Sequence, residues 1–179
     1  MDEHHQAERF REVALPHLHA AYRLARWLTR DHEIAQEVVQ EAYESAYRSF
    51  AAYRGGDGRC WILAIVRNES YEWLRRNRRE ASHEVFDEET YLGGEGDVGP
   101  ALRRNDPEAL LVLRDDSQRL TRALERLPAA YREIIVLREF DALSYREIAD
   151  LAGIPLGTVM SRLARARGAL LADLRDRGG

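Results

Sequence analysis

The chain has 179 residues, 45% of them hydrophobic, and carries a formal net charge of −4. Its longest uninterrupted apolar stretch runs from Trp61 to Val66, far short of the roughly 20 residues that cross a bilayer, and no charged-then-apolar leader opens it. One cysteine, Cys60, excludes an internal disulfide, and no cysteine and histidine stand at zinc-ligand spacing, so we expect a cytoplasmic protein without metal or membrane contact.

Residues 1–79 predict a first helical domain. Apolar positions recur every three or four residues over about 8–29, 32–51 and 58–79, which is the period of amphipathic helices. No stretch shows the alternation of a strand, and the conspicuous loop is the segment from Tyr53 to Asp57. We therefore expect three helices here.

The predicted helix over 32–51 has two different faces. One face is an apolar stripe that we expect to be buried, made of Ile34, Val38, Ala42, Ala46 and Phe50. The other is an acidic ridge with Gln40 beside it, made of Glu33, Glu37, Glu41 and Glu44. Such a charge run is usually a solvated helix face, and docking to a basic partner is the alternative.

The predicted helix over 58–79 ends in a basic cluster, with Arg67 one or two turns earlier. The cluster consists of Arg75, Arg76, Arg78 and Arg79, around Asn77. Arginines suit the negative end of a helix dipole, but their density also suits phosphate binding. Trp73 on this helix is expected in the core, or else stacks on an unpaired base.

Residues 80–118 differ in character from both flanks. They carry a net charge of −8, whereas residues 1–79 carry +1 and residues 119–179 carry +3. Few large apolar side chains and a strong like-charge excess predict a flexible acidic linker. The chain therefore divides into two helical domains joined by this linker.

Residues 119–179 carry the most specific pattern. Pro128 marks a helix boundary, and another helix is expected from Tyr131 to Phe140. The segment Ser144-Tyr145-Arg146-Glu147 is a capping box, which predicts a short helix from Ser144 to Ala152 that stops at Gly153. A longer helix follows from Leu156 to Arg175. A short helix, a glycine turn and a longer helix indicate a helix-turn-helix.

The last helix also has two faces. Its apolar stripe, expected to face the core, is Val159, Leu163, Ala166, Leu170 and Leu174. Ser161 and Arg165 then point away from the core, with Met160, Arg162 and Arg167 on the flanks. Small or polar residues near the start, with arginines beyond, suit a helix that enters a DNA groove. A surface helix with scattered arginines is the alternative.

These residues resemble a bacterial RNA polymerase sigma factor of the extracytoplasmic-function type. In the second domain, nearly the whole segment from Leu127 to Arg167 resembles region four of this family. In the first domain, the matching segments are 38–43 for region 2.2, and 53–56, 61–63 and 66–68 for the join of regions 2.3 and 2.4. The likeness covers roughly residues 15–79 and 120–175. It implies an all-α fold with region two at 1–79, an acidic linker at 80–118 and region four at 119–179.

The resemblance implies an alternative sigma factor that binds core RNA polymerase. Region two would dock on the clamp helices of the beta-prime subunit through Glu37, Gln40, Glu41 and Glu44, and the beta flap is the other expected polymerase contact. An anti-sigma factor or another regulator is also expected. The linker would thread into the basic channel of the polymerase, or act as a passive spacer.

The resemblance also implies two sets of promoter contacts. The melted minus-ten element would be bound by Tyr53, Arg54, Gly55, Asp57, Arg59, Trp61, Arg67, Asn68, Arg75 and Arg76. The duplex minus-thirty-five element would be bound by Arg146, Leu156, Gly157, Thr158, Met160, Ser161, Arg162, Arg165 and Arg167. Several positions depart from the family pattern. Gly58 stands where an aromatic is frequent, and Met160 where lysine is frequent; Tyr71, Trp73, Ile34 and Gln36 also differ from the usual residues.

Three other classes of protein compete with this interpretation. A helix-turn-helix regulator would explain the second domain but not the first. A helical scaffold or an anti-sigma antagonist would need neither Arg165 nor the small residues Gly157 and Thr158. An enzyme is disfavoured because the sequence shows no phosphate loop, no serine or cysteine nucleophile beside a plausible histidine and no clustered buried carboxylates.

Overall fold

The computed structural model describes residues 3–80 and 117–176, and within these ranges every regular element is a helix. The all-helical prediction is thereby confirmed. The predicted acidic linker lies almost wholly outside the described residues. None of the described helices is long and apolar enough to span a membrane.

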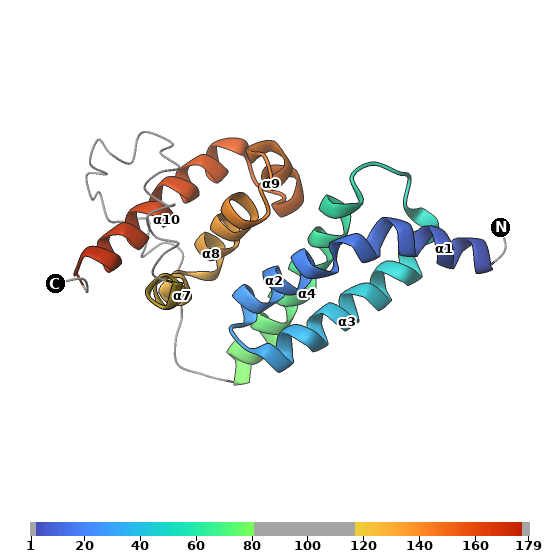
Figure 1. Cartoon of the computed structure of the whole chain (residues 1–179), viewed down its shortest axis with the longest axis horizontal. Helices are drawn as coiled ribbons and strands as arrows, with labels where there is room; N and C mark the ends of the chain where they lie inside the picture. The colour runs from blue at the N-terminus through green and yellow to red at the C-terminus, as the bar shows by residue number, and fades with distance from the viewer. Residues whose placement is uncertain (1–2, 81–116, 177–179) are drawn as a thin grey trace.

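Residues 3–80 form a helical unit that we call the N-terminal bundle (Figure 1). Its elements are α1 (Glu3–Ala14), the 3-10 turn η1 (Leu15–His17), α2 (Leu18–Thr29), α3 (His32–Ser49), the 3-10 turn η2 (Phe50–Ala52) and α4 (Gly58–Glu80). Helices α2, α3 and α4 pack on one another around buried leucines and alanines. The unit thus has one more helix than the sequence predicted.

The prediction of one continuous helix over 8–29 is wrong at Pro16. This proline lies in η1, at the junction of α1 and α2. Proline has no backbone N–H and its ring collides with the preceding turn, so it cannot continue a helix in its interior. The chain passes from α1 to α2 through the tighter 3-10 turn η1. Leu15 and Leu18, which flank Pro16 and His17, stay exposed.

Helix α3 begins and packs largely as the sequence predicts. The side chain of Asp31 caps it by accepting a hydrogen bond of 3.0 Å from the backbone N–H of Ile34. Most of the apolar stripe is buried, namely Val38, Ala42, Ala46 and Phe50. Ile34 is only partly buried because it lies in the exposed first turn. The opposite face of α3 is left to solvent.

Gly58 is required by the packing of α4 against α1. A Cβ atom at this position would lie 2.8 Å from both Cγ1 and the backbone oxygen of Val13. No flexible side-chain movement relieves a contact with a backbone oxygen. The family's frequent aromatic therefore cannot be accommodated at Gly58 without moving α1 away from α4.

Replacing Gly58 with alanine is expected to destabilise the N-terminal bundle by about 1–3 kcal/mol, the usual penalty of overpacking. The measurement is urea unfolding followed by circular dichroism. Gly157→Ala is the matched control, because a Cβ there has nothing within 4 Å and should change stability little. Equal midpoints for the Gly58 variant and the native chain would contradict the close approach to Val13.

Residues 117–176 form a second unit, the C-terminal bundle. Its elements are α7 (Ser117–Arg126), α8 (Ala129–Ile135), the π-helical turn η5 (Val136–Phe140), α9 (Tyr145–Ala152) and α10 (Leu156–Asp176). The capping box is confirmed: the N–H of Glu147 donates to Oγ of Ser144 at 3.2 Å, and the N–H of Ser144 donates to Oε2 of Glu147 at 2.6 Å. Gly153 ends α9 with φ of 66°, a left-handed conformation that favours glycine.

The helix predicted from Tyr131 to Phe140 is present, but its last part is wider than an α-helix. In η5 the N–H of Asp141 donates to the carbonyl of Val136, five residues earlier, at 3.1 Å. Single π turns of this kind are uncommon and often occur at functional positions. Here the turn leads directly into Asp141, whose side chain is buried.

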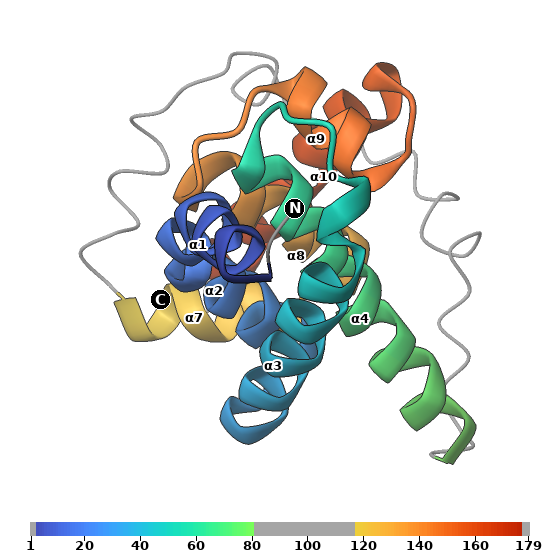
Figure 2. The same ribbon diagram turned by 90° about the vertical axis from the view of Figure 1, so that its right-hand side faces the viewer.

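The two bundles pack side by side. Helix α8 lies next to α2, and α9 lies next to the start of α4, as the two views in Figures 1 and 2 show. Buried residues of both bundles belong to a single apolar cluster. Among the described residues the two units therefore form one packed body.

Candidate functional site

The acidic ridge lies on the exposed side of α3. The expected polymerase contact consists of three ridge residues, Glu37, Glu41 and Glu44, and of Gln40 beside them, and all four are exposed. Within this group of described residues, Gln40 donates a 3.1 Å hydrogen bond to Glu44. The carboxylates of Glu37 and Glu41 therefore face solvent, and the ridge offers a continuous acidic surface.

Two aromatic residues of the expected minus-ten set are packed against each other. Tyr53 stacks on Phe50, with ring centroids 5.6 Å apart, and lies 4.8 Å from the ring of Trp61. The hydroxyl of Tyr53 donates to the carbonyl of Gly56 at 2.8 Å. These rings hold the loop between η2 and α4 in place, and Gly55 and Gly56 turn it with φ of 92° and 102°.

Asp57 caps the start of α4. Its Oδ1 accepts hydrogen bonds from the N–H groups of Arg59, at 2.8 Å, and Cys60, at 3.3 Å. The thiol of Cys60 also lies 4.0 Å from Oε1 of Glu147 in α9. Burial, together with the two nearby carboxylates, raises the pKa of this thiol to about 11, so Cys60 is protonated at neutral pH. Asp57 thus has a structural role, whereas Arg54 in the same loop is exposed.

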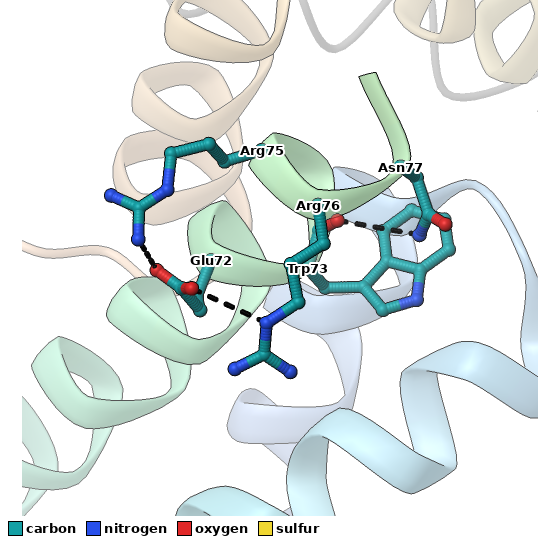
Figure 3. Close-up of polar contacts among 5 residues, drawn as sticks. All are labelled: Glu72, Trp73, Arg75, Arg76 and Asn77. Carbon is teal, nitrogen blue, oxygen red and sulfur yellow. Dashed lines mark hydrogen bonds and ion pairs between the residues drawn. The ribbon is translucent and has the colours of Figure 1, made fainter. Parts of the chain in front are cut away.

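Near the basic end of α4, one carboxylate, that of Glu72, pairs with two arginines (Figure 3). Glu72 pairs with Arg75 one turn later, and also accepts a 3.2 Å hydrogen bond from Nε of Arg76. These hydrogen bonds and charges lower the pKa of Glu72. Trp73 packs against the core and its carbonyl accepts from Asn77 at 3.3 Å, in agreement with the core interpretation of this residue. Arg75 and Arg76 are exposed and share a counter-ion.

Arg67 faces the C-terminal bundle. Its Nε donates to Oε1 of Glu133 in α8 at 2.9 Å, and its guanidinium lies over the ring of Tyr71, 4.6 Å from the centroid. Burial and the nearby carboxylate of Glu133 raise the pKa of Tyr71. Asn68, the next residue of the expected minus-ten set, is exposed instead. Arg67 and Asn68 therefore face different surroundings although they are adjacent in the chain.

The exposed side of the helix-turn-helix gathers most of the expected minus-thirty-five residues. The exposed ones are Arg146 on α9 and Leu156, Gly157, Met160, Ser161 and Arg165 on α10. The apolar stripe of α10 faces inward, with Val159, Leu163, Ala166 and Leu170 buried. The N-terminal half of α10 therefore offers small, apolar and cationic groups to solvent, as groove entry requires.

Three residues of the minus-thirty-five set are less exposed. Thr158 is partly buried, and its carbonyl accepts a 3.1 Å hydrogen bond from Ser161. Arg167 pairs with Glu139 at 2.5 Å within the C-terminal bundle. Arg162 is partly buried and acts electrostatically on Glu133 and Tyr71. Arg162 and Arg167 are thus engaged with protein groups in this structure.

Four charged residues with prominent contacts were absent from the sequence-based prediction. They are Arg23, Arg132, Glu133 and Asp141, of which the last three are buried. For two of them the sequence held a signal of buried charge: Arg132 and Glu133 come directly before four consecutive apolar residues. Charged residues are unusual at the start of such a buried stretch. Their partners lie far away in sequence, so the sequence alone did not reveal the pairing.

Comparisons with known proteins agree with this geometry. The chain matches the family described as "Sigma-70 region 2" over residues 14–80, and the family described as "Sigma-70, region 4" over residues 117–170. It is 37% identical to the ECF RNA polymerase sigma-E factor of Escherichia coli K12 over 138 residues, which is 75% of this chain and 70% of that protein. It is 34% identical to the RNA polymerase sigma-H factor of Pseudomonas aeruginosa over 161 residues, covering 88% and 82% of the two chains.

Solved structures show the same fold. The sigma factor RpoE of Bartonella quintana, in complex with the anti-sigma factor NepR, superposes with a TM-score of 0.69 at 26% identity, over 95% of this chain and 99% of that one. CnrH in complex with the cytosolic domain of CnrY superposes with a TM-score of 0.64 at 23% identity, over 96% and 90%. The chain therefore belongs to the extracytoplasmic-function sigma factors of the sigma-70 family, which bind core RNA polymerase and direct transcription initiation.

Proposed function

We propose that this sigma factor docks on core polymerase through the acidic ridge of α3 and reads two promoter elements with separate surfaces. The ridge contacts the beta-prime clamp helices, and the C-terminal bundle contacts the beta flap. The loop after η2 and the exposed side of α4 bind the melted minus-ten strand, while α9 and α10 bind the minus-thirty-five duplex. The chain catalyses no reaction itself and acts in the cytoplasm.

The observation that carries this proposal is the capped α9, the left-handed turn at Gly153 and the exposed N-terminal half of α10. Gly157 has nothing within 4 Å of a Cβ position, so the helix start is open to a close neighbour. Arg165 lies about two turns further along the exposed face. A guanidinium at this distance reaches a phosphate or a guanine edge when the helix start is in the major groove.

The same surfaces assign a separate role to each part of the chain. Region two is assigned to residues 1–79, the acidic linker to 80–118 and region four to 119–179. A regulator of the anti-sigma kind fits the similarity to the sigma factor RpoE of Bartonella quintana, which was solved in complex with the anti-sigma factor NepR. Each DNA-binding surface alone is small, so strong promoter binding needs the polymerase to hold both at once.

The deciding experiment is run-off transcription with purified core polymerase on a genomic promoter library, followed by sequencing of the transcript starts. A shared two-element motif upstream of the starts supports the proposal. Specific binding of a duplex operator by the purified protein without polymerase, with no redirected starts, would instead identify a regulator of the helix-turn-helix class.

Neutralising the ridge is expected to weaken polymerase binding. In the double variant Glu37→Gln and Glu41→Gln, two exposed charges are lost, each worth roughly 0.2–1 kcal/mol against a basic partner, so the affinity should fall about twofold to thirtyfold. Fluorescence anisotropy of labelled sigma with core polymerase measures it. The matched control is Glu8→Gln with Glu12→Gln, which removes two exposed charges at the same spacing on α1. An equal loss in the control would argue against a localised docking surface.

Removing Glu72 is expected to strengthen DNA binding by α4. Glu72→Gln leaves Arg75 and Arg76 without their shared carboxylate, so a phosphate no longer has to displace it. The holoenzyme should bind a fluorescent single-stranded minus-ten oligonucleotide severalfold more tightly, with a steeper salt dependence. Glu69→Gln removes the same charge from the same helix and should have the smaller effect. If both variants behave alike, Glu72 is not a specific competitor of DNA.

A further inference from the structure

The π-helical turn η5 sends two neighbouring charged side chains to the two helices of the helix-turn-helix. Arg138 reaches the segment that leads into α9, whereas Glu139 reaches α10. Neither residue belongs to the expected minus-thirty-five set, and both side chains are partly buried within the C-terminal bundle. The turn η5 is therefore connected to both helices of the helix-turn-helix through charged groups.

Arg138 holds the segment at the start of α9. Its Nη1 donates to the carbonyl of the buried Leu143 at 2.8 Å, and its guanidinium lies 4.9 Å from the ring centroid of Tyr145. Ser144, the residue between these two, caps α9. The segment also contains Ala142, whose φ of 53° is uncommon for a residue with a side chain. One guanidinium therefore contacts the chain on both sides of the α9 cap.

Glu139 holds α10 through Arg167. Nη2 of Arg167 donates to Oε1 of Glu139 at 2.5 Å, and the two side chains are 16% and 25% exposed, respectively. Solvent screens a partly buried pair less than a surface pair, and the loss of one partner leaves the other charge poorly compensated. This ion pair therefore ties the middle of α10 to η5.

Arg167 lies on a different side of α10 from Arg165. Two residues correspond to about 200° around an α-helix, so the two side chains leave the helix in nearly opposite directions. Arg165 is exposed, whereas Arg167 is partly buried against η5. This geometry favours Arg165 as the group that reaches DNA, and Arg167 as a group that fixes the helix.

We propose that Arg138 and Glu139 are positioning residues of region four, and that they set the angle at which α10 enters the minus-thirty-five groove. Arg138 fixes the start of α9. Glu139 fixes α10 by way of Arg167, which holds the helix and does not contact DNA. The angle matters because hydrogen bonds to base edges weaken steeply when they are misaligned. The inference rests on the proposed function of α10 as the helix that enters the groove.

The test compares how the holoenzyme binds two duplex promoter fragments that differ by one base pair in the minus-thirty-five element. The fragments are taken from a promoter found by run-off sequencing. The native holoenzyme should prefer the matched fragment by about fivefold to a hundredfold. Glu139→Gln, Arg167→Gln and Arg138→Gln should each lower this preference about fivefold, the worth of one base contact, while the affinity for core polymerase stays unchanged.

A charge swap separates positioning from a direct contact with DNA. Glu139→Arg with Arg167→Glu restores the ion pair with opposite polarity, so the swap should recover most of the preference. If Arg167 contacted a phosphate, the swap would place a carboxylate against DNA and the affinity would fall further. In that case Glu139→Gln alone would release Arg167 and tighten binding, which is the opposite of the expected result.

The matched control is Asp173→Asn, which breaks the pair with Arg126 between α10 and α7 and should leave the preference unchanged. Native preference in both Glu139→Gln and Arg138→Gln overturns the proposal. It is also overturned if the swap keeps native circular dichroism but binds more weakly than Arg167→Gln.

Arg165→Ala distinguishes this failure from a failure of the proposed function. Weaker promoter binding in Arg165→Ala, together with an unchanged preference in Glu139→Gln, removes only the positioning role. Unchanged promoter binding in both variants shows that α10 is not the helix that reads DNA, and it overturns the positioning role together with the proposed function.

Discussion

Arg132→Met is expected to unfold the C-terminal bundle well below the temperature at which the native chain unfolds. Arg132 is only 1% exposed, and its guanidinium donates to the carbonyls of Leu127, at 2.7 Å, and Glu125, at 3.1 Å, besides that of Leu28. Two of these acceptors lie at the end of α7 or just beyond it, where carbonyls lack partners within the helix. Burial lowers the pKa of Arg132 to about 10, so the side chain remains charged at neutral pH.

The expected loss of stability comes from the backbone carbonyls that methionine leaves without a hydrogen-bond donor. Its volume fills the space, but each abandoned buried carbonyl costs roughly 1–3 kcal/mol, which gives about 3 kcal/mol or more in total. That is a large share of a typical stability of about 5–15 kcal/mol. In a chain of this size it should lower the melting temperature by about 6–12 °C.

Thermal unfolding followed by circular dichroism measures this effect. Arg122→Met is the control, since Arg122 is an exposed arginine of α7 and its loss should shift the melting temperature by no more than about 1 °C. If Arg132→Met shifted the melting temperature by no more than this, the hydrogen bonds of Arg132 would not be needed for the stability of the chain.

The second large effect is expected in transcription. Replacing Arg162 and Arg165 with alanine should reduce promoter-directed run-off by about a hundredfold while core polymerase still binds. Specific contacts between a side chain and a base are worth roughly 1–3 kcal/mol each, and two of them give a factor of this order. Arg165 is exposed on α10, and Arg162 lies beside it on the flank.

Competition binding to core polymerase and run-off from one promoter, done with the same preparation, separate the two functions. Arg175→Ala is the control, because Arg175 is an exposed arginine in the last turn of the same helix, away from its DNA-entering start. Arg165→Ala alone should show part of the loss, which distinguishes it from any effect of Arg162 on the boundary with Glu133. Parallel loss of polymerase binding and transcription would mean that the substitutions damage the bundle itself.

Local features of the fold could be predicted where they depend on neighbouring residues. The capping box of Ser144 and Glu147, the stop at Gly153 and the buried stripe of α10 all follow from spacing within one helix or turn. The break at Pro16 was also readable from the sequence, yet the apolar period on both sides of it suggested one continuous helix. The π-helical turn η5 has no comparable local signal.

The same distinction between local and long-range features applies to the candidate site. Exposure of Glu37, Glu41 and Arg165 follows from the side of the helix on which each lies, and the structure places them there. The engagement of Arg67 with Glu133 depends on how two bundles far apart in sequence pack. No spacing rule contains that information, because an ion pair across 66 residues is a property of the tertiary structure.

The enclosed carboxylates of Asp141 and Glu133 have a quantitative consequence for any ligand that prefers the two bundles apart. If molecules with packed bundles outnumber those with separated bundles a hundredfold, only about one molecule in a hundred is ready for such a ligand, and the apparent dissociation constant of that ligand rises by the same factor. A conservative change at a position touching neither DNA nor polymerase could thereby reset the threshold of a whole transcriptional programme.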